Sequence, residues 1–510
     1  MNINIIKGGI IMKRITVLCM LLLTALLASC GESAAAPAET AASGGKDAAP
    51  ADGTEAVTQE TRLQPDLPGT DLGGYNFRVL TKGPGDGHWQ SKDIYSEAQN
   101  GEPINDAVFT RNSVLGEKYN FTVTEIPTSK DTWDVHSDVE KTVMAGEDAY
   151  DMAAIGLTYD MSVLAESNCL YNLYDIPYID LSKPWYDQKA NSSLSVGGKL
   201  YATTGDMIIM DNEAAYGILF NKEIAAELDL GNFYDTVKAG KWTIDRLLDA
   251  AKLASTDLNG DNVHDEFDRW GICGEAPNTI AFIVGMGEVS VKKDADDLPY
   301  FALQNDRYYS AFEKTLGVNG NFDICMYTTK FANKYPDVFA DCIDKTFIDG
   351  RMLFNCAGLV RVTLFRTMDI DFGILPMPKY DEAQAEYCSF VDLACANAIS
   401  VPSSVQNLEA VGLIIEAMSA ESMYTLTPAY YDVAVKGKAA RDEESLDMLD
   451  LIFSNCVYDL GYAYDWGSLV NTISNLMTNK APNISSTVEK NLSKAEKELA
   501  KSLEVLAEAD

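Results

Sequence analysis

The strongest constraint on the fold is an alternation of strand-like and helix-like segments that begins at residue 75. Residues 75–81 (YNFRVLT) and 121–126 (FTVTEI) alternate apolar and polar side chains, as half-buried strands do. Residues 104–120 and 134–147 carry apolar side chains at helical spacing, and 150–157 returns to a strand pattern. Strands that alternate with helices build an open α/β sheet, and ligands bind such sheets at the carboxyl ends of the strands.

The same alternation continues past residue 213. Its segments are 213–221 (strand), 222–230 (helix), 241–255 (helix), 269–274 (strand), 371–382 (a strand closed by prolines) and 445–456 (helix). Thr243 is placed to cap the second of these helices. About 440 residues follow the first 70, more than one compact core usually holds, so we expect two α/β lobes.

The end of the chain predicts one amphipathic helix. Ser486 and Glu489 have the spacing of a capping box, which would place the start of the helix there. One apolar stripe follows, formed by Val488, Leu492, Ala495, Leu499, Leu503 and Leu506. We expect the stripe to dock on a lobe and not to form a free coiled coil.

The first 29 residues have the pattern of an export signal. Lys13 and Arg14 precede an uncharged run over 15–29, which is shorter than the roughly 20 residues that cross a bilayer. We expect a signal peptide over residues 1–29, with Met12 as an alternative start. The run ends in Leu-Ala-Ser-Cys, which resembles the lipobox of bacterial lipoproteins and implies that Cys30 receives lipid. Ordinary secretion is the alternative.

Residues 30–70 predict a lipidated cysteine followed by a tether. The segment after Cys30 has no aromatic residue, and its large apolar residues are only Val57, Leu63 and Leu67. Such a segment cannot bury enough surface to offset its ordering entropy. A flexible chain of this length spans roughly 35 Å. The sequence therefore places the protein at the extracellular face of the cell membrane, held there by its lipid.

Composition excludes several classes of function. The formal net charge is −36, which repels phosphate backbones and argues against nucleic acid as a partner. The ten cysteines include no CxxC pair, so neither a zinc site nor a redox motif is indicated. Buried free thiols are expected, and disulfides are the alternative. The chain has three histidines and no HExxH, GxSxG or Walker motif, while 76 acidic residues make any carboxylate pair uninformative.

Ordered motifs in the body of the chain resemble one family. "GGKLYATTGDMIIMDNEAAYGILFNKEIAAELDL" is followed by "GKWTIDRLLDAA", and later by "GRMLFNCAG" and "FGILPMPKYDEAQAEY". Their order is similar to that in extracellular solute-binding proteins of ABC importers, of the carbohydrate type. The resemblance implies a two-lobed, periplasmic-binding-protein-like (type II) α/β fold with a hinge and an inter-lobe cleft. It also implies no catalysis, no required cofactor, and the permease subunits of an ABC importer as partners.

The same resemblance divides the chain. It implies a first lobe over 71–212, a second lobe over 213–390, a return to the first lobe over 391–440, and a closing segment of the second lobe over 441–510.

Cleft residues in such an architecture come from loops after strands and from the crossing segments. A tryptophan can stack on a sugar while polar neighbours bond its hydroxyl groups. The candidates for ligand contact are Trp89, Asp93, Tyr159, Asp206, Asn212, Arg361 and Trp466. Core packing, turn capping and surface ion pairing are the alternative roles for these side chains.

The acidic stretch 257–268 (DLNGDNVHDEFD) resembles a calcium loop of the EF-hand type. The candidate ligands are Asp257, Asn259, Asp261, the Val263 carbonyl, Asp265 and Asp268. Asn262 replaces the turn glycine, and Asp268 replaces the longer glutamate. A plain acidic turn is the alternative; a bound Ca²⁺ would be structural and away from the cleft.

The leading functional hypothesis is a receptor that binds a small solute, with a sugar or oligosaccharide favoured by the aromatic content, and delivers it to an ABC importer. Peptides also suit aromatic clefts. The alternatives are a secreted lipoprotein glycoside hydrolase and a ligand receptor for a membrane sensor.

Overall fold

The computed structural model describes most of the chain beyond residue 61. The described ranges are 62–83, 88–128, 134–158, 160–365, 368–436, 443–479 and 482–508. The predicted signal peptide, Cys30, most of the predicted tether and Tyr159 lie outside these ranges. The chain divides into two units, residues 1–62 and 63–510, and the fold given below is that of the second unit. Within the described ranges, no helix combines the length and apolar character needed to span a bilayer.

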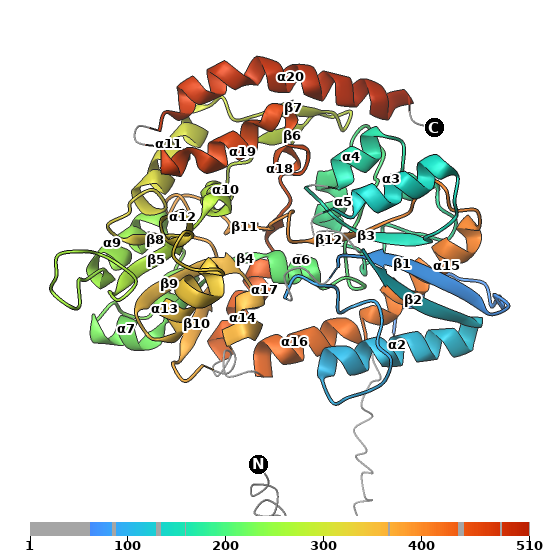
Figure 1. The fold of residues 1–510 in the computed structure, drawn as a ribbon, viewed down its shortest axis with the longest axis horizontal. Helices are drawn as coiled ribbons and strands as arrows, with labels where there is room; N and C mark the ends of the chain where they lie inside the picture. Colours follow the sequence, from blue (N-terminus) through green and yellow to red (C-terminus); the bar gives the residue numbers. More distant parts are fainter. Residues whose placement is uncertain are drawn as a thin grey trace, which may run out of the picture. The chain divides into compact units, whose positions relative to one another are not determined.

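A four-stranded sheet forms the first part of the unit. It consists of β1 (Tyr75–Thr81), β2 (Phe121–Pro127), β3 (Met152–Gly156) and β12 (Asn397–Ser400), in the order β12-β3-β1-β2. Strand β1 runs parallel to β2 and β3, while β12 is antiparallel to β3. The helices around this sheet are α2 (Pro103–Tyr119), α3 (His136–Ala145), α4 (Met161–Glu166), α5 (Gln188–Leu194), α15 (Leu408–Ser422) and α16 (Leu426–Lys436) (Figure 1).

A five-stranded sheet forms the second part. It consists of β4 (Tyr216–Asn221), β5 (Trp270–Gly274), β8 (Cys325–Tyr327), β9 (Met352–Gly358) and β10 (Phe372–Leu375), in the order β10-β4-β9-β5-β8. Pairs β10–β4 and β4–β9 are antiparallel, whereas β9–β5 and β5–β8 are parallel. Its helices are α7 (Lys222–Glu227), α8 (Phe233–Lys238), α9 (Ile244–Ala254), α10 (Ala276–Gly285), α11 (Asp306–Val318), α12 (Thr328–Phe331), α13 (Asp344–Ile348), α14 (Val360–Leu364) and α17 (Glu443–Phe453).

The remaining elements connect the two sheets or cover one side. They are α6 (Met210–Ala214), α18 (Leu460–Tyr464), α19 (Leu469–Ser474), α20 (Ile484–Glu508), the hairpin β6 (Val291–Lys293) and β7 (Pro299–Phe301), the parallel pair β11 (Ser389–Phe390) and β13 (Cys456–Val457), and the short helical turns η1 (Leu173–Asp175), η2 (Phe339–Ile343), η5 (Trp466–Ser468) and η6 (Asn475–Thr478). Two chain crossings lie together between the sheets, because Ala215 after α6 bridges Val391 after β11 (Figure 1).

Local sequence explains the packing behind the second sheet. The hydroxyl of Thr243 accepts a hydrogen bond from the Arg246 N–H at 3.3 Å, which caps α9 as predicted. The preceding Trp242 is buried and donates its indole N–H to the Pro376 carbonyl at 2.9 Å. Its ring lies edge-on to Phe233, with centroids 5.4 Å apart. The cap and the buried ring together fix α9 against the five-stranded sheet, which supplies one wall of the cavity described below.

The C-terminal helix docks by its predicted stripe but starts differently from the prediction. Helix α20 begins at Ile484, and the Asn483 carboxamide oxygen accepts the Ser486 N–H at 2.9 Å. The capping box at Ser486 and Glu489 was therefore wrong, because Asn483 supplies the cap one position before the helix begins. The helix contacts α4 beside the first sheet and α11 beside the second (Figure 1).

The predicted strands and helices are confirmed in order and type, with shifts at their ends. The strand expected over 213–221 is shorter, because residues 213 and 214 belong to α6. All eight cysteines of the described ranges are free thiols, six buried and two partly exposed, so the alternative of disulfides among them is not observed.

Candidate ligand-binding cleft

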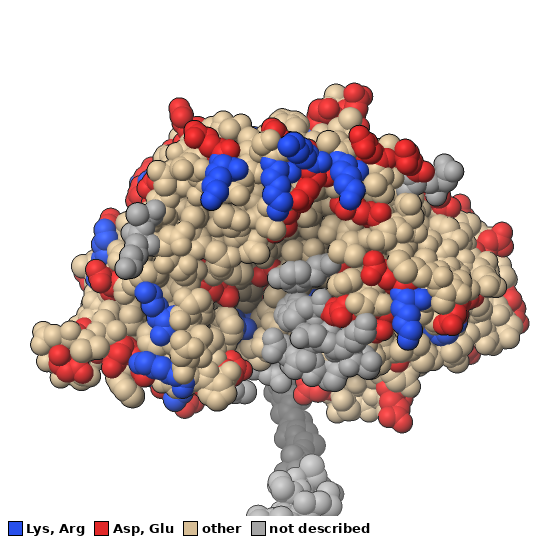
Figure 2. Space-filling view, turned by 45° about the horizontal axis from the view of Figure 1, so that its top comes forward, with Lys and Arg blue, Asp and Glu red and all other residues tan. Residues whose placement is uncertain are grey.

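A cavity of about 620 Å³ lies where the two sheets and the crossing segments meet. It is lined by His88, Trp89, Tyr216, Glu275, Pro277, Pro336, Asp337, Val338, Phe339, Ala357, Gly358, Arg361, Asp392, Ala394, Cys395 and Tyr462. Several of these residues stand at the carboxyl ends of strands: Glu275 follows β5, Gly358 ends β9, and His88 and Trp89 lie in the loop after β1. The face drawn in Figure 2 is hollowed near its centre, and acidic and basic side chains are interspersed around it.

Aromatic side chains form part of the wall. Trp89 comes from the loop after β1, yet it reaches the end of β9, since a Cβ built on Gly358 would lie 3.4 Å from its ring. Tyr216 and Tyr462 both pack edge-on against Phe390, with centroid separations of 5.4 and 5.3 Å. The wall is therefore built from segments far apart in the sequence, and Phe390 holds two of its rings in place.

Two carboxyl groups lie beside these rings. The Tyr216 hydroxyl donates to Glu275 at 3.4 Å, and the Tyr462 hydroxyl donates to Asp392 at 3.3 Å. Asp392 also accepts the Ala394 N–H at 3.1 Å. Burial, together with the negative charge of Asp392, raises the pKa of Glu275 to about 7. Burial likewise raises the pKa of Asp392 above its ordinary value.

Arg361 supplies the guanidinium group of the cavity. It lies on α14, and its Nε donates to Asp344 Oδ1 at 3.0 Å. The two side chains are only 7% and 10% exposed, so the pair is shielded from water. Burial alone would lower the pKa of Arg361, but Asp344 and Glu275 outweigh it and raise the value above the ordinary one.

Two of the sequence-predicted residues, Trp89 and Arg361, line the cavity. Asp93 is fully buried behind the Trp89 loop, where it accepts the Ile209 N–H at 2.9 Å and the Ser91 hydroxyl at 3.0 Å. This bonding ties the loop to the segment before α6.

The other candidates lie outside the lining. Asp206 accepts the Thr427 hydroxyl at 2.5 Å, and burial raises its pKa to about 6. Asn212 lies within α6. Trp466 is buried and donates its indole N–H to Ser502 at 2.8 Å, which joins it to α20. Ligand contact by these residues stays a prediction.

Sequence reasoning missed most of the polar and aromatic side chains of the lining, among them Glu275, Tyr462, Tyr216 and Asp392. Glu275 follows strand 269–274 directly, so the rule about strand ends could have found it. Tyr462 lies four residues before the selected Trp466. Tyr216 and Asp392 lie inside buried segments, and no local pattern marks them as facing a cavity.

The carboxylates of the acidic loop 257–268 accept hydrogen bonds from backbone N–H groups of the same loop. Asp257 accepts the Gly260 and Asn262 N–H groups at 2.7 and 2.9 Å, and the first of these bonds is the main reason that its pKa is lowered. Asn262, which stands where a calcium loop has its turn glycine, has a φ of 63°, a positive value that asparagine tolerates. Asp268 is fully buried and accepts the Leu258 N–H at 2.9 Å.

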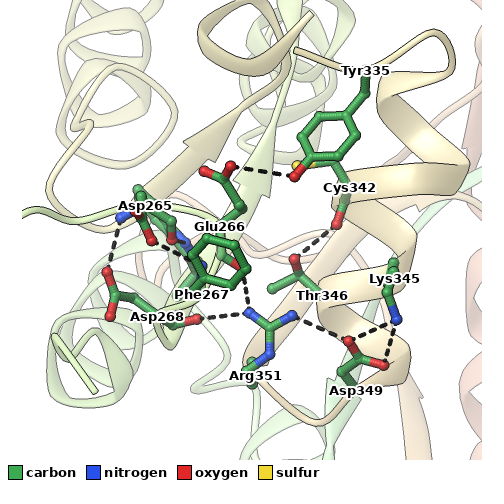
Figure 3. A network of polar contacts seen from close by, with 11 residues as sticks. Asp265, Glu266, Phe267, Asp268, Tyr335, Cys342, Lys345, Thr346, Asp349 and Arg351 are labelled. Atoms are coloured by element: carbon green, nitrogen blue, oxygen red, sulfur yellow. Dashed lines mark hydrogen bonds and ion pairs between the residues drawn. The ribbon is translucent and has the colours of Figure 1, made fainter. Parts of the chain in front are cut away.

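The end of this loop is hydrogen-bonded to Arg351, just before strand β9 (Figure 3). Arg351 donates to the carbonyl oxygens of Glu266 and Asp268, and pairs with Asp349 at 3.1 Å. Within the ranges that the structure describes, no group of three or more His, Cys, Asp or Glu side chains is placed to hold a metal ion. No residue of the loop lines the cavity. Calcium binding by the loop stays a prediction.

Comparison with known proteins gives the fold. No family model matches the sequence. No curated protein matches it either. Among solved structures, the galacto-N-biose-/lacto-N-biose I-binding protein of an ABC transporter from Bifidobacterium longum, in complex with lacto-N-biose, has a TM-score of 0.55 at 13% identity, over 86% of this chain and 99% of that one. The chain has the type II fold of the periplasmic binding proteins.

Two further structures share this fold. An ABC transporter solute-binding protein from Thermotoga lettingae, bound with α-D-tagatose, has a TM-score of 0.51 at 14% identity, over 84% of this chain and 100% of that one. The GacH receptor of Streptomyces glaucescens, solved unliganded and in complex with acarbose, has a TM-score of 0.50 at 11% identity, over 86% and 100% of the two chains. The names of these three describe binding proteins or receptors.

Proposed function

We propose that the protein is an extracellular receptor that binds a sugar or short oligosaccharide and delivers it unaltered to an ABC importer. The observation that carries this proposal is the cavity of about 620 Å³ between the two sheets, lined by aromatic rings and a few polar groups. Ligand pockets in proteins commonly measure about 300–1,000 Å³ and have this mixed lining. The complexes of similar folds with lacto-N-biose, α-D-tagatose and acarbose favour a sugar as the ligand.

The lining suits a sugar chemically. A tryptophan offers a flat apolar face to the CH groups of a pyranose ring. Trp89 lines the cavity from the loop after β1 and lies next to the end of β9 in the other sheet. Carboxylates accept hydrogen bonds from hydroxyl groups, and Glu275 and Asp392 lie beside the rings. The walls come from two sheets joined by crossing segments, so closure of one against the other would bury the ligand and favour the bound form.

The N-terminal sequence supports the location. An export signal, a lipobox-like Cys30 and a tether of low apolar content together favour a protein held at the outer face of the membrane. A tethered receptor keeps captured solute near its permease. We infer lipid on Cys30 and an importer as the partner from this arrangement.

Thermal unfolding of the full chain in the presence of sugars tests the binding step. A sugar at about 100 times its Kd should add roughly 2.7 kcal/mol to the free energy of unfolding. Trp89→Ala should weaken the binding of that sugar by about 5- to 30-fold, since a buried stacking ring contributes on the order of 1–2 kcal/mol. Phe267→Ala is the matched control, because Phe267 is 65% exposed and lies outside the cavity. Equal affinity for all three proteins would contradict the assignment of the site.

A second variant tests the anchor. Cys30→Ala should move the protein from the membrane fraction to the medium and abolish incorporation of labelled palmitate, while sugar affinity stays unchanged. Retention of the variant in the membrane would contradict lipid attachment at this residue.

A further inference from the structure

The cavity lining carries more acidic than basic groups. Among the described residues that line it, Glu275, Asp337 and Asp392 are acidic, and Arg361 is the side chain that is always positive. Arg361 is already paired with the carboxylate of Asp344 at 3.0 Å. Counting Asp344, the site holds four carboxyl groups against two positive groups, Arg361 and the buried Lys82 near Asp392, so it has a net negative charge when all are ionised.

Two of these carboxyl groups face the same space from different parts of the chain. Glu275 stands at the start of α10, after a strand of the second sheet, and Asp392 lies on the crossing that leads back to the first sheet. Their side-chain hydrogen bonds come from the hydroxyls of Tyr216 and Tyr462. A neutral hydroxyl does not cancel a charge, so the electrostatic repulsion between the two carboxylates remains. This repulsion contributes to the raised pKa of Glu275.

Aromatic rings surround this acidic pair. Trp89, Tyr216, Phe339 and Tyr462 all line the cavity. A cation within about 6 Å of a ring centroid is attracted to its face, and the attraction is stronger when water is excluded. Rings and carboxylates together form an environment suited to an ammonium group, and the same rings can stack on a sugar.

We propose that the cleft prefers a sugar that carries a basic amine, with the ammonium group held between Glu275 and Asp392 beside the aromatic wall. The proposal rests on the proposed function, because it names the class of sugar that the same cavity takes. A neutral sugar adds no positive charge to this net acidic site, and a uronic acid adds a further negative charge to it. An amino sugar supplies the missing positive charge and keeps the hydroxyl groups and ring faces.

The preference should depend on pH. An ammonium ligand stabilises ionised Glu275, so its affinity should rise from about pH 5.5 to about pH 7 as Glu275 loses its proton, whereas a neutral sugar should show little change. The other charged or titratable groups around Glu275 are Asp392, Asp337, Asp344, Arg361, His88, the tyrosines Tyr216, Tyr327 and Tyr462, and the thiols Cys273, Cys356 and Cys395, with Lys82 near Asp392. Binding of the amine should also release a proton from Glu275. Calorimetric titrations in buffers of different ionisation enthalpy measure this proton release.

Isothermal titration calorimetry on the full chain tests the proposal. The probes are glucose, galactose, mannose and their disaccharides, each compared with its 2-amino-2-deoxy form and its uronic acid. We expect the amino form to bind at least about tenfold more tightly than its neutral parent, the value of one added charged hydrogen bond, and the uronic acid to bind most weakly.

Glu275→Gln should remove most of the preference for the amino form over its neutral parent, because the amide accepts hydrogen bonds but carries no charge. Glu288→Gln is the matched control, because Glu288 follows the C-terminal end of α10 and does not line the cavity. This variant loses the same charge and should still prefer the amino sugar.

The outcomes separate the two claims. Neutral sugars that bind as tightly as their amino forms would overturn the amine preference and leave the proposed function standing. No binding by any sugar in the panel would overturn both. The comparison of neutral, amino and acidic sugars on the unaltered protein at two pH values decides the matter even where Glu275→Gln does not fold.

Discussion

Removal of the Arg361 guanidinium is expected to destabilise the unliganded protein strongly. Arg361→Met keeps most of the apolar stem and deletes the charge that faces Asp344. Both side chains of the pair are 10% exposed or less, so water cannot replace the lost partner. Breaking a buried ion pair on one side typically costs about 3–5 kcal/mol, because an uncompensated charge remains.

The cost should depend on pH in a defined direction. Burial raises the pKa of Asp344, and Arg361 holds it down. Without Arg361 the folded-state pKa of Asp344 rises further above its unfolded value of 3.8. The penalty is therefore full above that folded pKa and shrinks as the pH falls toward about 4, where Asp344 is protonated in both states.

Urea unfolding followed by tryptophan fluorescence at about pH 8 and pH 5 measures both effects. Arg361→Met combined with Asp344→Asn should recover at least about 1 kcal/mol relative to Arg361→Met alone. Arg307→Met is the control, because the Arg307–Asp381 pair is exposed and is expected to be worth at most about 1 kcal/mol. A loss below about 1 kcal/mol for Arg361→Met, or an equal loss at both pH values, would show that Asp344 is not left with a buried, uncompensated charge.

Three further changes have defined outcomes. Burial raises the pKa of Asp211 to about 8, so the folded state keeps a proton that the unfolded state loses, and stability falls as the pH rises from about 4 to 8. Asp211→Asn should therefore raise Tm at about pH 8 and flatten the dependence of Tm on pH. An unchanged dependence of Tm on pH would count against this role of Asp211. Thr243→Ala removes the acceptor for the Arg246 N–H and should cost about 1 kcal/mol in chemical denaturation, whereas Thr243→Ser should cost much less. Gly205→Ala would place a Cβ 2.2 Å from the Trp185 carbonyl oxygen at a φ of 156°, so its Tm should drop by more than that of Thr243→Ala; an equal or higher Tm would show that the turn can relax.

The sequence was most informative where periodicity and capping act locally. The strand at 75–81, helix α2 and helix α9 with its Thr243 cap appear as expected, because each depends on residues within a few positions of one another. The capping box at Ser486 failed because Asn483, a stronger cap in this context, lies three residues earlier. Local rules alone cannot rank two competing caps.

The site was harder to predict because it is made by tertiary contacts. Trp89 was accessible to sequence reasoning as an aromatic residue in a loop after a strand. Tyr216 and Asp392 are both within buried segments, and only the bridge between the two crossings brings them to one cavity. Trp466 shows what its local sequence could not reveal: its indole N–H donates to Ser502 on α20, a helix predicted from a separate pattern. Ligand contact by Trp466 stays a prediction.

Equilibrium dialysis of the full chain against the sugar panel, followed by mass spectrometry of the retained solute, decides whether the protein captures a sugar and leaves it unaltered. We expect about one sugar per chain to be retained and recovered chemically unchanged, with less sugar retained by Trp89→Ala and an unchanged amount retained by Phe267→Ala. Retention of no sugar, or recovery of hydrolysed products, would rule out this function.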